Sequence, residues 1–320
     1  MGLIVHLFIE SRCNYRCKHC FTSKKNERLT VKDVKYFLDM MSSYNIDSVN
    51  IAGSGNPLLN SEFDRIISYC SNYGDVTLNF RGIIDDSKIL LLKDYNVKVY
   101  YSIDRIYNTR EFYGNNLGEI QWDYLVKLIE SDVEIIIRTT VMRDNIKDVK
   151  DIISTAHTMA QNGWIEGWYG MPYVAHKPDD PLLPSDEQLL TIYRTISSIT
   201  DGVFLLVHPV TNALDPRLHR KFKEMVEPYG WTCGFGKKDG RVCLKEDKMV
   251  YGCAFDIEPL TDMKDIECLW CKAEEKAMSA PLPDKCRNCS MYRKGKCKGG
   301  CIVTRTYAND VVCPIAAVRN

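Results

Sequence analysis

The hydrophobic residues of this chain follow two alternating patterns, which indicate strands joined by helices. Residues 3–9 are apolar and largely β-branched and lack a helical period, as is typical of a buried strand. A helix is predicted after Thr30, because Thr30 and Asp33 can form a capping box ahead of apolar residues at helical spacing. The loop at residues 10–29 therefore connects the first strand to the first helix.

The same alternation continues to about residue 177. Further strands are predicted at residues 48–51, 76–80, 97–104, 133–141 and 165–173, and further helices at residues 61–74, 86–93, 120–130 and 146–161. Six βα repeats predict parallel strands with helical crossovers, curved as in a barrel or flat as in an open sheet. In both arrangements ligands bind at the carboxyl ends of the strands.

The composition of the chain changes twice beyond this region. Proline and aspartate at residues 177–184 interrupt the alternation, and the segment up to residue 229 is predicted to hold helices at 185–198 and 216–226 and a strand at 203–207. From residue 230 the chain is rich in Cys, Gly and Lys. We therefore expect a domain at residues 1–177, a bridging region at 178–229 and a small cysteine-rich domain at 230–320.

Charge and hydropathy exclude several classes of partner. The 320 residues carry 42 basic and 42 acidic side chains, so no electrostatic footprint for nucleic acid is expected. No apolar run reaches the length of a membrane span, and the N-terminus lacks the pattern of a secretory leader. A cytoplasmic protein that contacts neither membrane nor nucleic acid is predicted.

The number and position of the cysteines indicate metal binding. Fourteen cysteines are many for a reducing compartment, and ten of them follow residue 230. Cys70 is an exception, because it shares the apolar face of a predicted helix and is expected to be a buried thiol.

Three further cysteines, Cys13, Cys17 and Cys20, lie in the loop after the first strand with the spacing Cx3Cx2C. Three thiolates can converge on one metal centre, and three protein ligands leave one iron of a 4Fe–4S cube open. The alternative is a zinc knuckle with His19 as the fourth ligand.

The Cx3Cx2C motif resembles the signature of the radical S-adenosylmethionine (SAM) superfamily, in which the open iron chelates SAM. Reduction of the cluster then yields a 5′-deoxyadenosyl radical that takes a hydrogen atom from substrate. His19 stands where the family usually has an aromatic residue. The resemblance places Tyr15 and His19 in the cofactor pocket and implies a partial (β/α)6 TIM-like barrel.

The resemblance also implies SAM-binding residues at later strand ends. Ser54, Gly55 and Asn56 stand where the family has Gly-Gly-Glu, and the amide of Asn56 can accept a hydrogen bond but brings no charge. The alternative for this segment is a plain glycine turn. The other implied cofactor-binding residues are Ser102, Asp104, Arg138 and Asn145. Ser102 and Asp104 could equally be turn caps, and Arg138 could pair with a neighbouring strand.

The late cysteines, taken alone, would favour zinc, because CxxC pairs also build tetrahedral zinc sites. With the first motif present, their spacing resembles the SPASM extension of radical SAM enzymes. Lys248 replaces an expected glycine, and seven residues instead of five separate Cys289 from Cys297. The resemblance implies an outer 4Fe–4S cluster on Cys286, Cys289, Cys297 and Cys313, and an inner one on Cys233, Cys253 and Cys301. The fourth inner ligand is left open between Cys243, Cys268 and Cys271.

The function implied is that of a radical SAM oxidoreductase or peptide maturase with three 4Fe–4S clusters, which crosslinks, epimerises or oxidises a ribosomally synthesised peptide. Cys243, Cys268 and Cys271 are also candidate hydrogen-atom donors. Only twelve residues precede Cys13, so peptide recognition is expected to need the barrel mouth or a separate recognition protein. An electron donor such as flavodoxin or ferredoxin is a further expected partner. The alternatives are a dehydrogenase or epimerase of a small carbohydrate or aminocyclitol, and a zinc-binding module or iron–sulfur electron carrier.

Overall fold

The computed structural model describes residues 2–22, 25–114, 117–199, 204–206, 234–235, 237–294 and 299–311. The chain divides into two compact units that interleave along the sequence. Unit 1 comprises residues 1–102, 108–135 and 234–278, and unit 2 comprises residues 103–107, 136–233 and 279–320. The helix expected at residues 216–226, and Cys233, Cys297 and Cys313, lie outside the described residues. The three domain boundaries expected from the sequence stay predictions.

Unit 1 is built on strands in the order β10-β9-β8-β1-β2-β3-β4. Their bounds are β1 Leu3–Phe8, β2 Ile46–Ala52, β3 Asp75–Phe80, β4 Lys98–Ser102, β8 Arg241–Leu244, β9 Met249–Tyr251 and β10 Thr261–Asp262. The strands from β8 through β1 to β4 pair in parallel, whereas β9 and β10 are antiparallel additions. Strand β1 is therefore internal, with β2 on one side and β8 on the other.

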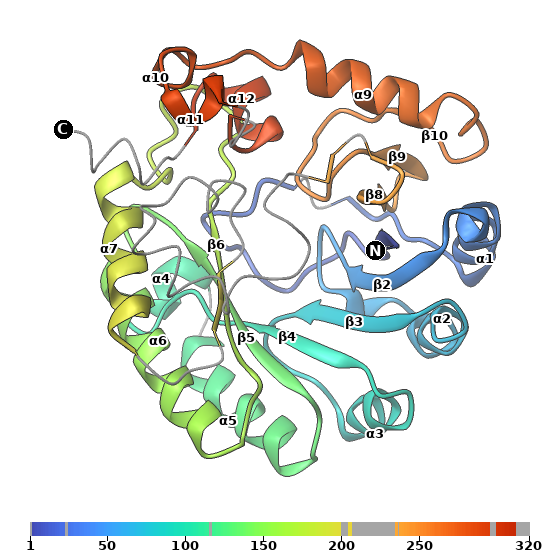
Figure 1. The fold of residues 1–320 in the computed structure, drawn as a ribbon. Coiled ribbons are helices and arrows are strands. Elements are labelled where there is room, and N and C mark those ends of the chain that lie inside the picture. The colour runs from blue at the N-terminus through green and yellow to red at the C-terminus, as the bar shows by residue number, and fades with distance from the viewer. Residues whose placement is uncertain are drawn as a thin grey trace. The chain divides into compact units, whose positions relative to one another are not determined.

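The helices of unit 1 connect these strands. They are α1 Val31–Met41, α2 Phe63–Cys70, α3 Asp86–Asp94, α4 Thr109–Tyr113, α5 Leu117–Glu130 and α9 Leu269–Ser279, with 3-10 turns η1 Ser42–Tyr44 and η2 Pro57–Leu59. Figure 1 shows α1, α2 and α3 side by side along strands β1 to β3. The capping box predicted for α1 is present, since Thr30 and Asp33 bond each other's backbone N–H groups.

The core of unit 1 follows the periodicity of the sequence. Leu3, Val5 and Leu7 of β1 are fully buried, as expected for alternate residues on one face of a strand. Cys70 is fully buried on α2 beside Ile66 and Ile67, which confirms the prediction of a core thiol. Burial raises the pKa of this thiol, so Cys70 is kept in its neutral form.

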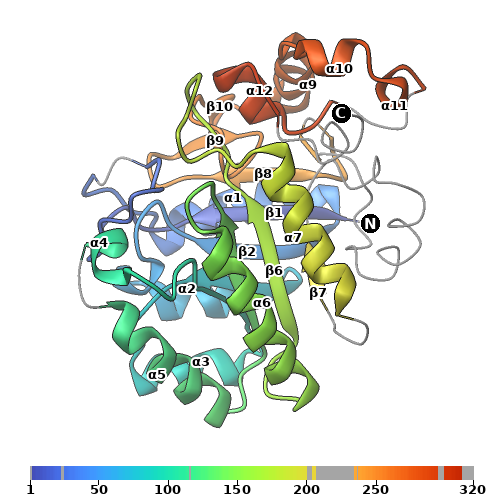
Figure 2. The ribbon, with the colours of Figure 1, turned by 90° about the vertical axis from the view of Figure 1, so that its left-hand side faces the viewer.

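Unit 2 contains the parallel strands β5 (Ile135–Val141, of which Ile135 is assigned to unit 1), β6 (Gly167–Pro172) and β7 (Phe204–Leu206). Its helices are α6 Ile146–Gln161, α7 Asp186–Ser198, α10 Asp284–Arg287, α11 Ser290–Arg293 and α12 Ile302–Ala308. Figure 2 shows α6 and α7 running alongside β6. Trp168 of β6 is fully buried and donates a hydrogen bond from Nε1 to Thr139 Oγ1 at 2.9 Å, so its indole is both packed and satisfied.

After residue 230 the structure contains strands that the sequence analysis did not assign. The residues from 241 to 251 form a β-hairpin, and its first strand, β8, joins the parallel sheet of unit 1 beside β1. Four residues are too short a run for the sequence to distinguish a strand from a loop. A part of the cysteine-rich region therefore belongs to the same sheet as β1, the strand that leads into the Cx3Cx2C loop.

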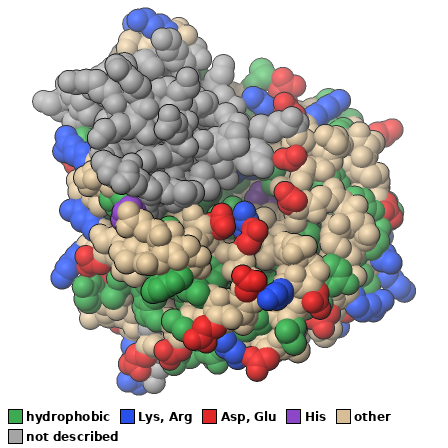
Figure 3. Space-filling view, turned by 60° about the horizontal axis from the view of Figure 1, so that its bottom comes forward, with side chains coloured by type: hydrophobic (Ala, Val, Ile, Leu, Met, Phe, Trp, Pro, Cys, Tyr) green, Lys and Arg blue, Asp and Glu red, His purple; other side chains and the backbone are tan. Residues whose placement is uncertain are grey.

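Surface properties of the described residues agree with the balanced composition. On the face drawn in Figure 3, acidic and basic side chains are interspersed among the coloured residues. Within the described part of the chain, none of the helices combines the length and the apolar character needed to cross a membrane.

Candidate functional site

The loop that carries Cys13, Cys17 and Cys20 is held by backbone hydrogen bonds on two sides. Gly55 N donates to Glu10 O at 2.9 Å and Asn56 N to Arg12 O at 2.8 Å, which joins the loop to the turn after β2. On the other side Arg16 N donates to Tyr113 O at 3.0 Å. The described residues of the loop are thus fixed by contacts on two sides.

Gly55 is required by the closeness of this contact. A Cβ atom at residue 55 would lie 2.0 Å from Arg12 O and 2.5 Å from Arg12 C, both backbone atoms that cannot move independently. The second residue of Ser54-Gly55-Asn56 is therefore a glycine because the turn and the cysteine loop pack backbone to backbone.

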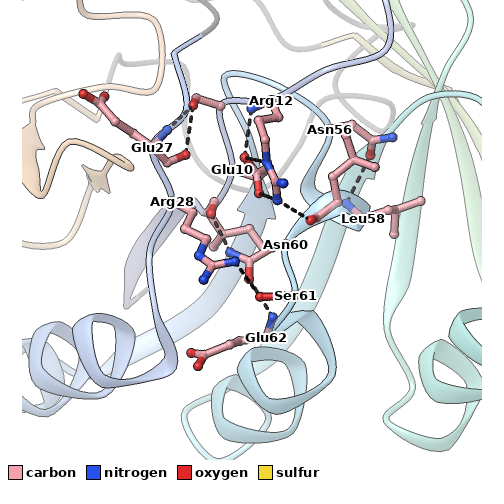
Figure 4. Close-up of polar contacts among 12 residues, drawn as sticks. Glu10, Arg12, Glu27, Arg28, Asn56, Leu58, Asn60, Ser61 and Glu62 are labelled. Carbon is pink, nitrogen blue, oxygen red and sulfur yellow. Dashed lines mark hydrogen bonds and ion pairs between the residues drawn. The ribbon is translucent and has the colours of Figure 1, made fainter.

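An ion pair between the buried carboxylate of Glu10 and the partly exposed Arg12 fixes the start of the same loop. The carboxylate of Glu10 is buried, and it accepts hydrogen bonds from Arg12 N at 2.9 Å, Arg12 Nε at 3.0 Å and Arg12 Nη2 at 2.7 Å. Arg12 Nη2 also donates to Leu59 O at 2.7 Å (Figure 4). Both ends of this pair are satisfied within the protein, so its role is to hold the backbone.

None of the three thiols of the loop is in a disulfide. Cys13 and Cys17 are half-buried and Cys20 is exposed. Arg81 Nη1 donates to Cys17 Sγ at 3.7 Å, and the guanidinium lies 4.2 Å from the ring centroid of Tyr113. A positively charged side chain therefore lies beside one of the three thiols.

The donor set suits an iron–sulfur cluster, since three cysteines that are not in disulfides share one loop with an arginine beside one of them. In the part of the chain that the structure describes, no three His, Cys, Asp or Glu side chains already converge on one point as metal ligands would. The ligand roles of Cys13, Cys17 and Cys20 therefore stay predictions.

Tyr15 and His19, the other predicted pocket residues of the loop, are positioned by packing. Tyr15 is buried, and its hydroxyl accepts a hydrogen bond from Ile83 N at 3.4 Å. Burial raises the pKa of Tyr15, so the phenol is neutral. His19 stacks on Phe112, with ring centroids 5.2 Å apart. These contacts fix both rings beside the thiols, and their cofactor roles stay predictions.

The side chain of Asn56 caps the 3-10 turn that follows β2. Asn56 is buried, and its Oδ1 accepts a hydrogen bond from Leu58 N at 3.1 Å at the start of η2 (Figure 4). Its predicted contact with a cofactor stays a prediction. Ser54 lies at the other end of the segment, where its carbonyl accepts a hydrogen bond from Thr22 Oγ1 at 2.6 Å.

A residue that the sequence interpretation missed lies against this turn. Glu246 sits in the hairpin turn between β8 and β9 and is only 7% exposed. Its carboxylate forms a hydrogen bond with the side chain of Ser54, while its Oε2 has no hydrogen-bond partner among the described residues. Burial raises the pKa of Glu246. The sequence around it gives no signal of burial, because Lys245, Glu246 and Asp247 form a run of charges that is typical of a solvated turn.

The candidates Asp104 and Asn145 form one hydrogen-bonded network in unit 2. Asp104 Oδ1 accepts from Thr140 N at 2.6 Å. Asn145 is fully buried, its Oδ1 accepts from Met142 N at 2.7 Å, and its Nδ2 donates to Asp104 O at 3.0 Å and to Thr140 O at 2.8 Å. The polar atoms of the Asn145 side chain therefore connect the loop after β4, the strand β5 and the turn that follows β5.

The remaining two candidates, Ser102 and Arg138, are half-buried. Arg138 lies in the middle of β5, where its carbonyl accepts a hydrogen bond from Ile103 N at 2.9 Å. Ser102 is the last residue of β4. Their predicted contacts with a cofactor stay predictions.

The later cysteines of unit 1 differ strongly in exposure. Cys243 of β8 is 0% exposed and packs with Phe8, Tyr251 and Ala254, and burial raises the pKa of its thiol well above the usual value. Cys253, just after β9, is half-buried, whereas Cys268 and Cys271 are exposed at the beginning of α9. Cys243 thus has the surroundings of a core residue, and its predicted role as ligand or hydrogen-atom donor remains to be tested.

The described cysteines of unit 2 lie at the ends of short helices. Cys286 is buried in α10, and Cys289 N donates to Cys286 O at 3.0 Å in the tight turn expected of a CxxC pair. Cys301 precedes α12 and follows Gly299 and Gly300, whose φ angles are +84° and +80°. Both glycines adopt left-handed backbone that disfavours any other residue. The assignment of these thiols to an outer or inner cluster stays a prediction.

Comparisons with known proteins show a similarity in the N-terminal part of the chain. The model of the radical SAM superfamily matches residues 9–156, which include Cys13, Cys17 and Cys20 and the turn after β2. This part of the chain is thus similar to the radical SAM superfamily.

Two curated proteins are similar in sequence. An S-adenosylmethionine-dependent nucleotide dehydratase of Selenomonas ruminantium is 36% identical over 76 residues, which are 23% of this chain and 27% of that protein. The chain thus matches about a quarter of that relative's length. A GTP 3′,8-cyclase of Sulfurimonas denitrificans is 21% identical over 285 residues, which cover 82% of this chain and 84% of the relative.

Solved structures confirm the fold. SuiB of Streptococcus suis bound to S-adenosylmethionine superposes with a TM-score of 0.70 at 14% identity, covering 98% of this chain and 77% of SuiB. The enzyme anSMEcpe with bound AdoMet gives a TM-score of 0.68 at 16% identity, covering 99% of this chain and 94% of its own. The predicted fold class, an α/β partial barrel of mostly parallel strands, is confirmed by these matches.

Proposed function

We propose that this protein is a radical SAM enzyme that generates a 5′-deoxyadenosyl radical and modifies a ribosomally synthesised peptide. The observation that carries the first part is the match of residues 9–156, which contain the Cx3Cx2C motif, to the radical SAM superfamily. The fold of the whole chain, which resembles SuiB and anSMEcpe, supports the same class.

Cys13, Cys17 and Cys20 would hold the 4Fe–4S cluster, which when bound supplies the electron that cleaves the sulfonium of SAM. The protein prepares this loop through its own contacts. Arg81 lies beside Cys17 Sγ and offsets the negative charge that a thiolate carries. The Glu10–Arg12 pair and the backbone contacts of Gly55 hold the loop before any cofactor binds.

The later cysteines would provide the auxiliary clusters of the proposed enzyme. Cys286, Cys289 and Cys301 lie in or next to short helices of unit 2 and Cys253 follows β9 in unit 1, and none of them is in a disulfide. Cysteines in this number support a role in electron transfer to or from the substrate, with flavodoxin or ferredoxin as the external donor. The peptide as substrate is supported by the structural likeness to SuiB, which has been solved bound to its precursor peptide SuiA.

A nucleotide is the second candidate substrate. It is favoured by the curated relatives, because one is named as a nucleotide dehydratase and the other as a GTP cyclase. Binding of GTP or a nucleoside triphosphate mixture to the purified protein, set against binding of a cysteine-containing precursor peptide, would separate the two classes of substrate.

Formation of 5′-deoxyadenosine tests the proposed chemistry. The protein reconstituted with iron and sulfide under anaerobic conditions is expected to hold about twelve irons if three 4Fe–4S clusters form. With SAM and dithionite it should release 5′-deoxyadenosine, and Cys17→Ala should abolish this product and lower the iron content by about four.

Cys70→Ala is the matched control, because it also removes a thiol but one that is buried in the core. It should retain both the iron and the product. A colourless protein that binds zinc, or 5′-deoxyadenosine formation that survives Cys17→Ala, would contradict the proposal.

A further inference from the structure

The side chain of Arg81 reaches one sulfur of the Cx3Cx2C motif. Arg81 directly follows β3, and the motif follows β1. Both strands are parallel to β2, which lies between them, so the two segments leave the sheet at the same edge. There Arg81 Nη1 donates to Cys17 Sγ at 3.7 Å. Arg81 and Cys17 both belong to unit 1.

The short helix α4 positions the guanidinium and the sulfur together. Arg81 Cζ lies 4.2 Å from the ring centroid of Tyr113, the last residue of α4, in a cation–π contact. The carbonyl of Tyr113 accepts a hydrogen bond from Arg16 N at 3.0 Å, and the carbonyl before it accepts from Lys18 N at 3.1 Å. The residues on both sides of Cys17 are thus bound to the helix whose last ring supports Arg81.

Two buried tyrosines fix the backbone that follows Arg81. The hydroxyl of Tyr101 donates to Gly82 O at 3.2 Å, and the hydroxyl of Tyr15 accepts from Ile83 N at 3.4 Å. Arg81 therefore extends from fixed backbone, and its guanidinium is already held by a ring. Little conformational entropy remains to be lost when the guanidinium is kept against the sulfur.

The charge of Arg81 is permanent and only partly screened. An arginine side chain stays protonated in proteins, and Arg81 is half-buried. Salt screens a partly buried charge less than an exposed one. Lys18, next to Cys17 in the sequence, is exposed instead and pairs with Glu111. Arg81 is therefore the better placed of these two cations to act on charge at the Cys17 sulfur.

A hydrogen bond and a positive charge at a cluster sulfur act on the reduction potential. Cys17 is one of the three proposed ligands of the 4Fe–4S cluster. Reduction of such a cluster takes one electron from the external donor and adds one negative charge. A nearby donor and cation stabilise this added charge, so they raise the potential. A higher potential makes the electron easier to supply from flavodoxin or ferredoxin.

We propose that Arg81 raises the reduction potential of the cluster on Cys13, Cys17 and Cys20 by donating to Cys17 Sγ. This inference rests on the proposed function and adds to it a residue that controls how readily the cluster is reduced. Arg81 acts through the sulfur of Cys17 and takes no part in bond cleavage.

The test is the midpoint potential of this cluster, measured without SAM by an EPR-monitored dithionite titration of the full chain after anaerobic reconstitution. The signal of this cluster is the one that Cys17→Ala removes. Arg81→Met keeps an unbranched side chain beside the Tyr113 ring and removes the charge and the donors. One-electron reduction should become about tenfold less favourable, a fall of about 59 mV in midpoint potential, as for loss of a charged hydrogen bond.

Arg81→Lys and Lys18→Gln separate the contact from the charge of the loop. Arg81→Lys keeps a positive charge but replaces the planar fork with one ammonium, so its potential should lie between those of wild type and Arg81→Met. Lys18→Gln is the matched control, because it removes a charge beside Cys17 that is exposed and paired with Glu111. It should move the potential by less than about a quarter of the Arg81→Met shift, since exposed charges are screened.

The outcomes separate this inference from the proposed function. If Cys17→Ala removes no cluster signal, the proposed function fails and the inference fails with it. A cluster that forms in both proteins with the same midpoint potential in wild type and Arg81→Met would overturn the inference alone. An equal fall in Lys18→Gln would overturn it as well. Arg81→Gln, with a neutral amide, is the second variant if Arg81→Met does not fold. Its potential should also fall, and a value equal to that of wild type contradicts the inference.

Discussion

The polar residues at the strand ends of the two units are used in different ways. In unit 2, Asn145 makes three hydrogen bonds to Met142, Asp104 and Thr140, and no polar atom of its side chain remains for a ligand. In unit 1, Glu246 is also buried. Its carboxylate forms a hydrogen bond with the side chain of Ser54, but its Oε2 accepts none from the described residues. Both side chains follow strands of a parallel sheet, where ligands commonly bind.

The difference shows that position at a strand end is not sufficient to assign a ligand role. The decisive property is whether the fold already satisfies the polar atoms of the side chain. By this criterion the fold satisfies the polar atoms of the Asn145 side chain, whereas Glu246 Oε2 accepts no hydrogen bond from the described residues. The predicted cofactor role of Asn145 stays a prediction. The Glu10–Arg12 pair of unit 1 belongs with Asn145, because each oxygen of Glu10 already accepts a hydrogen bond from Arg12.

The largest effect on stability is expected at Gly55, where the fold leaves no space for a Cβ atom. Gly55→Ala would place a Cβ atom 2.0 Å from Arg12 O, so either the turn or the cysteine loop must shift. We expect a loss of about 3 kcal/mol in the free energy of unfolding, typical of overpacking against atoms that cannot move. Because the shift displaces the Cx3Cx2C loop, iron content after reconstitution should also fall. Urea denaturation and iron analysis measure the two effects.

Gly163→Ala is the control for this substitution. Gly163 follows α6 with a φ of +72°, and a Cβ there would meet no atom within 4 Å. Alanine should therefore cost only about 1–2 kcal/mol of backbone strain and leave iron binding intact. If Gly55→Ala and Gly163→Ala lose the same free energy of unfolding and keep the same iron content, the packing of the turn against the loop is not what fixes the site.

A somewhat smaller effect on stability is expected at Asn145. Asn145→Ala leaves Met142 N and the carbonyls of Asp104 and Thr140 without their partners inside the protein, which should cost roughly 2–3 kcal/mol. Asn162→Ala, at the other end of α6, removes one exposed hydrogen bond to Thr158 O and should cost well below about 1 kcal/mol. Urea denaturation compares the two variants. Weak SAM binding by a fully stable Asn145→Ala would show that Asn145 contacts the cofactor after all.

Much of the fold could be predicted from the sequence because its signals are local. The apolar run of β1, the capping box of α1 and the periodicity of α6 each depend on neighbouring residues, and the structure has these elements at or within two residues of the expected bounds. The burial of Cys70 followed in the same way from its place on the apolar face of α2. Local patterns therefore predicted the βα repeats and the position of the cysteine loop.

The hairpin and its glutamate could not be predicted, because their structure depends on contacts between distant residues. Strand β8 has four residues and is stabilised by pairing with β1, at the other end of the sequence. Glu246 stands between Lys245 and Asp247, and such a run of charges is typical of a solvated turn. Its burial results from the parallel pairing, which brings the turn against Ser54. The cap that Asn56 provides for η2 was also not predicted, and its cofactor role stays a prediction.

The smallest effect expected is a change of stability with pH at Glu246. Burial raises the pKa of Glu246, and the proximity of Asp247 acts in the same direction, while the hydrogen bond from Ser54 and the charge of Lys245 oppose it. A carboxyl whose pKa is higher in the folded than in the unfolded protein stabilises the fold most below its ordinary pKa, and this contribution is lost as pH rises through the raised value. Wild type without SAM should therefore lose stability relative to Glu246→Gln as pH increases over this range.

Urea denaturation at a series of pH values measures the difference between the two proteins. Asp247→Asn, in which Glu246 still titrates, should keep a pH dependence like that of wild type. Parallel stability curves for wild type and Glu246→Gln would mean that Glu246 does not titrate in this range. The contrast with the fully satisfied Asn145 would then lose its basis.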